Sequence, residues 1–576
     1  MSTASSVIAY FSMEIGLEPS IPTYSGGLGV LAGDTIRAAA DVGLPMLGIT
    51  LAHRNGYFEQ RLDESGWQHE RPSTWDPSLR LAEAPVRVTV EVEGRMVQVR
   101  AWRYDVVGAR GHVVPVYLLD TDLPENSDAD RHLTDVLYGG DVHYRLCQEV
   151  VLGMGGAALV RALGHSHGVQ HHVNEGHAAL AALALLERQL GGRSAWELDD
   201  ADLEAVRTQC VFTTHTPVPA GHDRFDRGLA ERVLGGERVT LLDRAGAMSG
   251  DSLNMTMLAL RFSHYVNAVA RRHQEVSQEM FPDYTVQAVT NGVHAVTWTS
   301  EPFRALFDRH VPGWREDNFL LRHVVDVPLD EIRDAHSLAK QALFEEVARR
   351  TGTKLDRSVM TIGFARRATA YKRADLVLTD PARLRQIVRN VGPLQIVFAG
   401  KAHPRDEVGK GLIRSIAQAA AALADDVRIV YVENYDMRLG GLLTSGTDLW
   451  LNNPLRPLEA SGTSGMKSAL NGVPSLSVLD GWWVEGCVEG ATGWSIGDDA
   501  RLPQDPARDI PELYLKLERV ILPMFYAMPY SYAAVMRGAI AVNGSYFNTQ
   551  RMVLQYAMNA YGLETGAISR ERVVGV

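Results

Sequence analysis

Five short apolar runs in the second half of this 576-residue chain alternate with helical patterns, and this alternation constrains the fold more than any other feature. The runs cover residues 358–364, 394–400, 427–432, 447–451 and 474–479. Helical patterns between them include the stretch from Arg373 and the alanine-rich run 412–424. Strands and helices that alternate at this spacing indicate a parallel sheet covered by helices, a Rossmann-like domain. Ligands of such sheets bind beyond the carboxyl ends of the strands, so functional loops should follow these runs.

The first half follows a similar plan with less regularity. Its strand-like runs cover residues 8–13, 46–52, 171–176 and 210–218. Hydrophobic alternation over 86–104, on either side of Glu93 and Gly94, predicts an antiparallel hairpin. A long amphipathic helix is expected over 326–352 and a terminal helix over 548–562. We place the boundary between two α/β domains near residue 300, with a cleft between them as the expected active site.

Charge and cysteine usage narrow the class of protein. The 57 basic and 69 acidic side chains give a net charge of −12, which disfavours binding to nucleic acid or to an anionic membrane surface. Cys147, Cys210 and Cys487 form no CxxC pair, so we expect neither a disulfide framework nor a zinc cluster, and a reducing cytosol fits best. The N-terminus lacks the pattern of a signal peptide, and no apolar stretch is long enough to predict a membrane-spanning helix.

Four cations follow the apolar run 358–364: Arg366, Arg367, Lys372 and Arg373. Four positive charges so close together repel one another, which is unfavourable unless an anion or carboxylates lie among them. This cluster therefore indicates a local phosphate site in an acidic protein. A solvated, salt-bridged start of a helix is the alternative interpretation.

Residues 459–472 (EASGTSGMKSALNG) combine a loop of small residues with Lys467 in the first turn of an expected helix. The loop exposes N–H groups and hydroxyls that can bind a phosphate. A desolvated lysine amine can serve as a nucleophile. Pyridoxal phosphate (PLP) needs both features, an amine for its aldehyde and an anion site for its phosphate. The alternative is a glycine-rich turn with a surface lysine.

These two segments, with SGGLG at 25–29, THT at 214–216 and TNG at 290–292, resemble the PLP-dependent α-glucan phosphorylases, the family of the glycogen, starch and maltodextrin phosphorylases. The motifs keep the family order from residue 8 to about residue 545. The resemblance implies a GT-B-type fold of two Rossmann-like domains facing across a cleft. It places the N-terminal glucan-binding domain at 1–299 and the PLP-binding domain at 300–545. A C-terminal helix within 546–576 is expected to pack back on the first domain.

The resemblance also implies the reaction. Phosphate would attack the non-reducing end of an α-1,4-glucan and release α-glucose 1-phosphate reversibly, with retained configuration. The partners would be an α-glucan (maltodextrin, glycogen or starch) and inorganic phosphate or glucose 1-phosphate. The phosphate group of PLP would act as general acid–base. Family members are typically dimeric, but the oligomeric state of this shorter chain stays open. Because the first motif begins at residue 8, we expect no N-terminal segment of the kind that phosphorylation regulates in animal members.

Each implied site residue is carried over by its motif. Lys467 would carry PLP, and Arg367, Lys372 and His215 would join it in catalysis. The cofactor would also contact Thr463, Ser464, Arg366, Tyr435 and Trp298. Phosphate and glucosyl groups would contact Gly27, Leu28, His215, Asn291, Glu459, Ser461 and Gly462.

Three other functions are possible for such a chain. A nucleotide-sugar glycosyltransferase of the same architecture, independent of PLP, often repeats a carboxylate eight residues after the first. Here Glu459 is followed at that spacing by Lys467, whose ammonium cannot accept hydrogen bonds from ribose hydroxyls. A non-catalytic glucan-binding protein is disfavoured because Lys467 and Arg367 are both present. The histidine-rich run 164–172 matches no standard metal motif, so we expect a solvated loop and no metal site.

Overall fold

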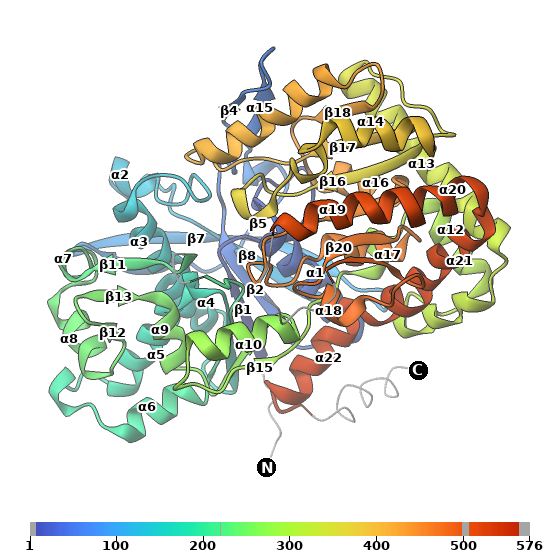
Figure 1. Cartoon of the computed structure of the whole chain (residues 1–576). Helices are drawn as coiled ribbons and strands as arrows, with labels where there is room; N and C mark the ends of the chain where they lie inside the picture. Colours follow the sequence, from blue (N-terminus) through green and yellow to red (C-terminus); the bar gives the residue numbers. More distant parts are fainter. Residues whose placement is uncertain (1–6, 219–220, 498–505, 564–576) are drawn as a thin grey trace.

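The computed structural model describes residues 7–218, 221–497 and 506–563. Two largely parallel sheets with flanking helices make up most of this part of the chain (Figure 1). One sheet is formed by the first half and the other by the second half. No helix within these residues is long and apolar enough to cross a bilayer.

The first sheet has the strand order β15-β14-β10-β9-β1-β2-β8-β7-β5. The strands from β15 to β8 pair in parallel, whereas β7 is antiparallel to β8 and to β5, and β6 adds to β7 as the expected hairpin. The bounds are β1 Val7–Ser12, β2 Met46–Leu51, β5 Ala82–Glu83, β6 Val88–Val92, β7 Arg95–Val107, β8 Val113–Asp120, β9 Val169–Asn174, β10 Cys210–Thr213, β14 Tyr265–Ala268 and β15 Gln287–Ala288.

The second sheet is parallel throughout, in the order β18-β17-β16-β19-β20-β21. Every residue of β16 and β17 is buried, because helices cover both faces and the strands are continuous apolar runs. The bounds are β16 Met360–Ala365, β17 Leu394–Ala399, β18 Arg428–Val432, β19 Leu449–Asn452, β20 Ser475–Val478 and β21 Gly493–Ile496. Smaller pieces are the hairpin β3 Glu59–Leu62 with β4 Gln68–Arg71, and the three-stranded sheet of β11 Arg224–Asp226, β12 Met248–Ser249 and β13 Ser252–Asn254.

The helices connect and cover these strands. Those of the first half are α1 Gly27–Val42, α2 Asp128–Arg131, α3 Val142–Val150, α4 Gly156–Ala162, α5 Leu180–Leu190, α6 Asp200–Arg207, α7 Arg227–Leu234, α8 Gly236–Arg244, α9 Met255–Arg261 and α10 Arg271–Met280. Those of the second half are α11 Ala295–Trp298, α12 Glu301–His310, α13 Leu329–Thr351, α14 Pro381–Asn390, α15 Glu407–Ala422, α16 Met437–Gly446, α17 Ser464–Leu470, α18 Trp483–Gly486, α19 Pro506–Lys516, α20 Leu522–Ala527, α21 Pro529–Gly538 and α22 Thr549–Asn559.

The strands agree with the expected runs, each of which starts within two residues of the observed strand. Two expectations are wrong. The stretch from Arg373 is not a helix but short 3₁₀ turns, because Arg373 adopts a left-handed φ of 49°, and α14 begins only at Pro381. The run 164–172 is not wholly a solvated loop, because His171 and His172 lie buried in β9.

Each half of the chain also packs on the sheet of the other half. The β3–β4 hairpin extends to the second sheet, where Gln60 Nε2 donates to Gly400 O at 2.8 Å and Arg61 pairs with Glu433 at 2.8 Å. Figure 1 shows β4 beside α15. In return, α22 packs on α1 and the first sheet, and Tyr556 Oη accepts a hydrogen bond from Asn267 Nδ2 at 2.9 Å. Residues 564–576 of the expected C-terminal segment lie outside the described residues.

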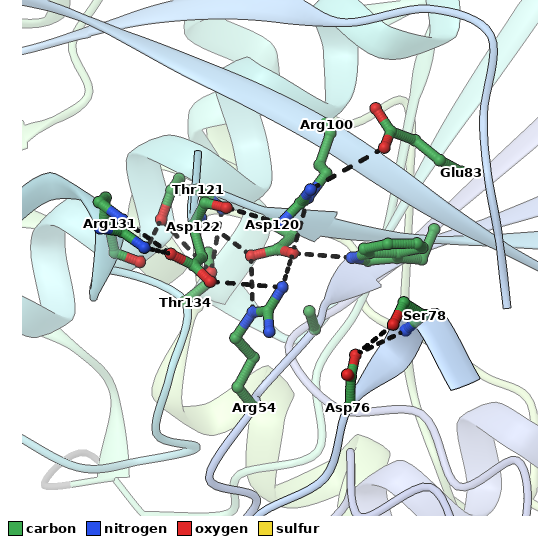
Figure 2. A network of polar contacts seen from close by, with 12 residues as sticks. Arg54, Asp76, Ser78, Glu83, Arg100, Asp120, Thr121, Asp122, Arg131 and Thr134 are labelled. Carbon is green, nitrogen blue, oxygen red and sulfur yellow. Dashed lines mark hydrogen bonds and ion pairs between the residues drawn. The ribbon is translucent and has the colours of Figure 1, made fainter. Parts of the chain in front are cut away.

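A buried carboxylate at the carboxyl end of β8 organises the loops of the first sheet (Figure 2). Asp120 accepts hydrogen bonds from Arg54 Nη2 at 2.8 Å, Arg100 Nε at 3.0 Å and Trp102 Nε1 at 2.7 Å. Burial favours the neutral acid, but the hydrogen bonds and charge of Arg54 hold the pKa of Asp120 below its ordinary value. The loop after β2 is thereby fixed to β7 and β8.

Candidate active site

A cavity of about 1450 Å³ lies where the carboxyl ends of the two sheets meet. Its walls come from the loops that follow β1, β9 and β10 of the first sheet and β16, β17, β18 and β19 of the second. This is where α/β sheets place their ligands. The residues expected from sequence that line it are Gly27, Leu28, His215, Asn291, Arg366, Arg367, Lys372, Tyr435, Glu459, Ser461, Gly462, Thr463, Ser464 and Lys467. Trp298 does not line the cavity but lies behind Lys467.

Three charged side chains form a compact cluster in the second half. Glu459 Oε2 lies 2.6 Å from Arg366 Nη2 and 2.5 Å from Lys372 Nζ. Burial would favour neutral Glu459, but the charges of the two cations outweigh it and lower the pKa of Glu459 to about 2. The two cations predicted to bind phosphate therefore contact the carboxylate predicted to bind sugar. The three side chains together carry one net positive charge, which favours binding of an anion.

Arg367 faces the glycine loop of the first half. Its Nη2 donates to Ser25 Oγ at 3.3 Å, and α1 begins at Gly27 with no acidic residue in its first turn. The loop is held from behind by Glu14, whose Oε2 accepts from the N–H groups of Ser25 at 2.5 Å and Gly26 at 3.2 Å. A Cβ at Gly27 would meet no atom within 4 Å, so the space in front of the helix is open. A helix N-terminus opposite a guanidinium is well suited to bind phosphate.

Lys467 is buried and forms no salt bridge in the described parts of the chain, although the charge of Asp34 acts on its amine. Its Nζ lies 3.6 Å from the ring centroid of Trp298, and Trp298 Nε1 donates to Asp34 Oδ2 at 2.7 Å. Burial lowers the pKa of Lys467 to about 8, so its amine is partly uncharged near neutral pH. A buried amine beside an aromatic ring and an anion site fits the donor set that PLP requires.

Among the buried polar atoms of the cavity-lining residues that lack a partner within the described chain, two belong to residues expected to bind glucosyl groups. They are Oδ1 of Asn291 and Oγ of Ser461. Leaving such atoms unpaired costs about 1–3 kcal/mol each unless a ligand or water satisfies them. Gly462 follows with φ of 90°, a conformation that side chains rarely adopt. The wall is therefore prepared for a ligand with hydroxyl groups.

His215 is positioned by the last residue of β9 and by the residue that follows it. Its Nε2 lies 2.7 Å from Asn174 Oδ1, and its backbone N–H donates to Glu175 Oε2 at 2.8 Å. Burial lowers the pKa of His215 to about 3, so the ring is neutral at physiological pH. A neutral imidazole can exchange hydrogen bonds with sugar hydroxyls but does not supply a charge.

Sequence reasoning missed several residues of this cavity. Glu14 and Glu175 hold the two loops described above, and Tyr138 Oη donates to Glu14 Oε1 at 3.0 Å. Glu175 directly follows β9 and Glu14 lies two residues beyond β1, which was the available signal, but Glu175 also has a positive φ of 70° that no pattern indicates. No group of three histidine, cysteine or acidic residues that could hold a metal ion occurs within the described residues.

Comparisons with known proteins agree on one family. Residues 236–490 match the family model described as carbohydrate phosphorylase. The chain is 40% identical to the maltodextrin phosphorylase of Thermococcus litoralis, over 96% of this chain and 70% of that protein. It is 37% identical to the glycogen phosphorylase of Mycobacterium tuberculosis, with the same coverage, and 34% identical to that of Aquifex aeolicus, over 96% of this chain and 86% of the relative.

Proposed function

The chain belongs to the carbohydrate phosphorylase family and is an α-glucan phosphorylase, and we propose that it acts on α-1,4-glucans with retained configuration and carries PLP on Lys467. The single observation that carries the cofactor assignment is the buried Lys467 amine beside Trp298, which forms no salt bridge within the described residues. The alternative, a nucleotide-sugar glycosyltransferase, has no support in the relatives, which are named phosphorylases.

We propose that one set of cavity residues binds the substrate phosphate and another set binds the glucosyl group. Arg367, Lys372 and the N-terminus of α1 would bind the substrate phosphate, since they present positive charge to one open space. Asn291, Ser461 and the neutral His215 would bind glucosyl hydroxyls, because all three line the cavity and the side-chain oxygens of Asn291 and Ser461 have no partner within the described residues. Two domains facing across this cleft, with a boundary near residue 300, remain the proposed architecture.

The residues around Lys467 would hold PLP by its ring and its phosphate. Tyr435 and Trp298 supply aromatic surface, and Arg366, Thr463 and Ser464 supply donors for the phosphate. When bound, PLP would supply a phosphate group that exchanges a proton with the substrate phosphate. In the net reaction, a phosphate oxygen bonds to the anomeric carbon as the glycosidic bond breaks, and the released glucan oxygen takes up a proton.

Reduction with borohydride and peptide mapping test the cofactor assignment. A pyridoxyl adduct is expected on Lys467 of protein supplied with PLP. Lys401 is the matched control, because it also lines the cavity and burial lowers its pKa to about 8, but its Nζ donates to Phe58 O at 2.8 Å. An adduct on Lys401 alone, or on neither lysine, would refute the assignment.

A second experiment concerns turnover. Lys467→Ala is expected to abolish release of glucose 1-phosphate from maltodextrin and phosphate, and Lys401→Ala to retain it. NMR of the product should show only the α anomer. Equal turnover in both variants would contradict the role of Lys467, whereas a β product would contradict retention.

A further inference from the structure

Asp34, a buried residue of α1, binds the same indole ring that contacts Lys467. The residue is 1% exposed, and its Oδ2 accepts hydrogen bonds from Trp298 Nε1 at 2.7 Å and from the His294 N–H at 3.1 Å. Lys467 Nζ lies over the face of the ring, 3.6 Å from its centroid. The carboxylate at the N–H and the amine at the face are therefore linked through one ring.

Trp298 is held from both halves of the chain. Its carbonyl oxygen accepts from Asn471 Nδ2 at 2.8 Å, and the same Nδ2 donates to Lys467 O at 2.9 Å. Asn471 thus ties the backbone of Trp298 to α17, the helix that carries Lys467. The indole ring itself is fixed by its hydrogen bond to Asp34, so the orientation of the ring against the amine depends on that carboxylate.

One face of α1 binds the segment that carries Trp298. Asp34, Arg37 and Asp41 are spaced so that they share this face. Arg37 Nη1 lies 3.3 Å from Asp34 Oδ1, and Asp41 Oδ2 lies 2.8 Å from His294 Nε2. The N-terminus of the same helix faces the space assigned to the substrate phosphate. A single rigid element therefore borders both the phosphate and the ring behind the cofactor lysine.

The charge of the Lys467 amine depends on this arrangement. A cation over the face of a tryptophan ring is attracted by the ring, and a hydrogen bond from the indole N–H to a carboxylate polarises the ring further. Among the described residues, the charge of Asp34 favours the ammonium form and that of Arg37 opposes it.

We propose that Asp34 is a positioning residue of the cofactor site, which holds Trp298 against Lys467 and supplies the negative charge that balances a charged nitrogen there. The inference rests on the proposed attachment of PLP to Lys467. It assigns to α1 a role in the cofactor site as well as in the phosphate site.

The reactivity of the Lys467 amine tests this role without PLP. The full-length protein, freed of PLP, is treated with a small acylating reagent at a series of pH values. Peptide mapping follows the label on Lys467, since only the uncharged amine reacts. Asp34→Asn keeps the side-chain volume and one acceptor oxygen but removes the charge. The midpoint of the Lys467 profile should fall by about one pH unit, so labelling at pH 7 should become several-fold faster.

Three other variants give the control and the sign. Asp41→Asn is the matched control, because Asp41 lies on the same helix and also contacts the segment before Trp298, but is not among the charges that act on Lys467. Its profile should equal that of the wild type. Arg37→Gln should raise the midpoint, because a positive charge is lost. Trp298→Phe keeps a ring without the N–H and should lower the midpoint, which preserves the test if Asp34→Asn does not fold.

An unchanged Lys467 profile in Asp34→Asn or in Trp298→Phe, or an equal shift in Asp41→Asn, would overturn the proposal. Failure of the proposed function is seen separately. A wild-type protein that forms no pyridoxyl adduct on Lys467 would refute the cofactor assignment, whereas the acylation profiles would still decide whether Asp34 acts on the amine.

Discussion

Replacing Glu459 by glutamine removes the charge that compensates Arg366 and Lys372 and keeps the side-chain volume. The carboxylate lies 2.5 Å from Lys372 Nζ, and its pKa falls from an ordinary 4.5 to about 2. A difference of roughly 2.5 pH units corresponds to about 3 kcal/mol of folding free energy. Because the pKa is lower in the folded state, this contribution is complete above pH 4.5 and is lost as the pH falls toward about 2.

At pH 7 the variant should therefore lose about 3 kcal/mol of unfolding free energy. For a domain of this size each kcal/mol corresponds to roughly 2–4 °C, so the melting temperature should fall by about 6–12 °C. Calorimetry in chloride and phosphate buffers of equal ionic strength measures this. The loss should be smaller in phosphate, because the anion can take the place of the carboxylate between the two cations.

Glu331→Gln is the control for this experiment. Glu331 also contacts two basic side chains, Arg309 and His310, but is partly exposed and remote from the cavity. The stability that Glu331→Gln loses should be small and equal in both buffers, because solvent screens an exposed ion pair. If Glu459→Gln loses the same stability in phosphate as in chloride, Arg366 and Lys372 do not form a phosphate site, and the reasoning is refuted.

Three other predictions follow from buried charges. Asp120→Asn should cost about 3–5 kcal/mol, measured by denaturant unfolding, with kcat unchanged, because Arg54 and Arg100 lose their shared partner; a stable variant would contradict this. Burial raises the pKa of Asp480 to about 7, so the folded state retains a proton that the unfolded state loses, and stability falls as the pH rises from 3.8 to about 7. Asp480→Asn should reduce the loss of unfolding free energy between pH 5 and pH 8 by about 3 kcal/mol. An unfolding free energy with the same pH dependence in the variant and in the wild type would disprove this. The rate at which PLP attaches to Lys467, followed by borohydride trapping, should rise up to about pH 8 and then level off, since only the uncharged amine reacts; a rate independent of pH would contradict the pKa.

Strand positions were predictable because buried parallel strands are continuous apolar runs, as β16 and β17 show. The failure at Arg373 has a tertiary cause. Its guanidinium donates to Asn453 O at 2.8 Å and to Asp509 Oδ2 at 2.8 Å, which holds the backbone in a left-handed turn. Local sequence carries no trace of partners 80 and 136 residues away.

The candidate site was predictable to the extent that its residues follow strands. Arg366 and Lys467 belong to motifs whose residue types themselves indicate a chemistry, whereas Glu14 holds the backbone of the loop at Ser25, 11 residues further along the chain.

The β3–β4 hairpin of the first half packs on the second sheet, and α22 of the second half packs on the first sheet. Cutting the chain near residue 300 would therefore leave both fragments incomplete. The first fragment would uncover the apolar surface that Met552, Val553 and Tyr556 cover, and would carry a hairpin without its support. Separately produced fragments should therefore aggregate, whereas fragments produced together should reassemble, which makes this chain a natural candidate for a split-protein reporter.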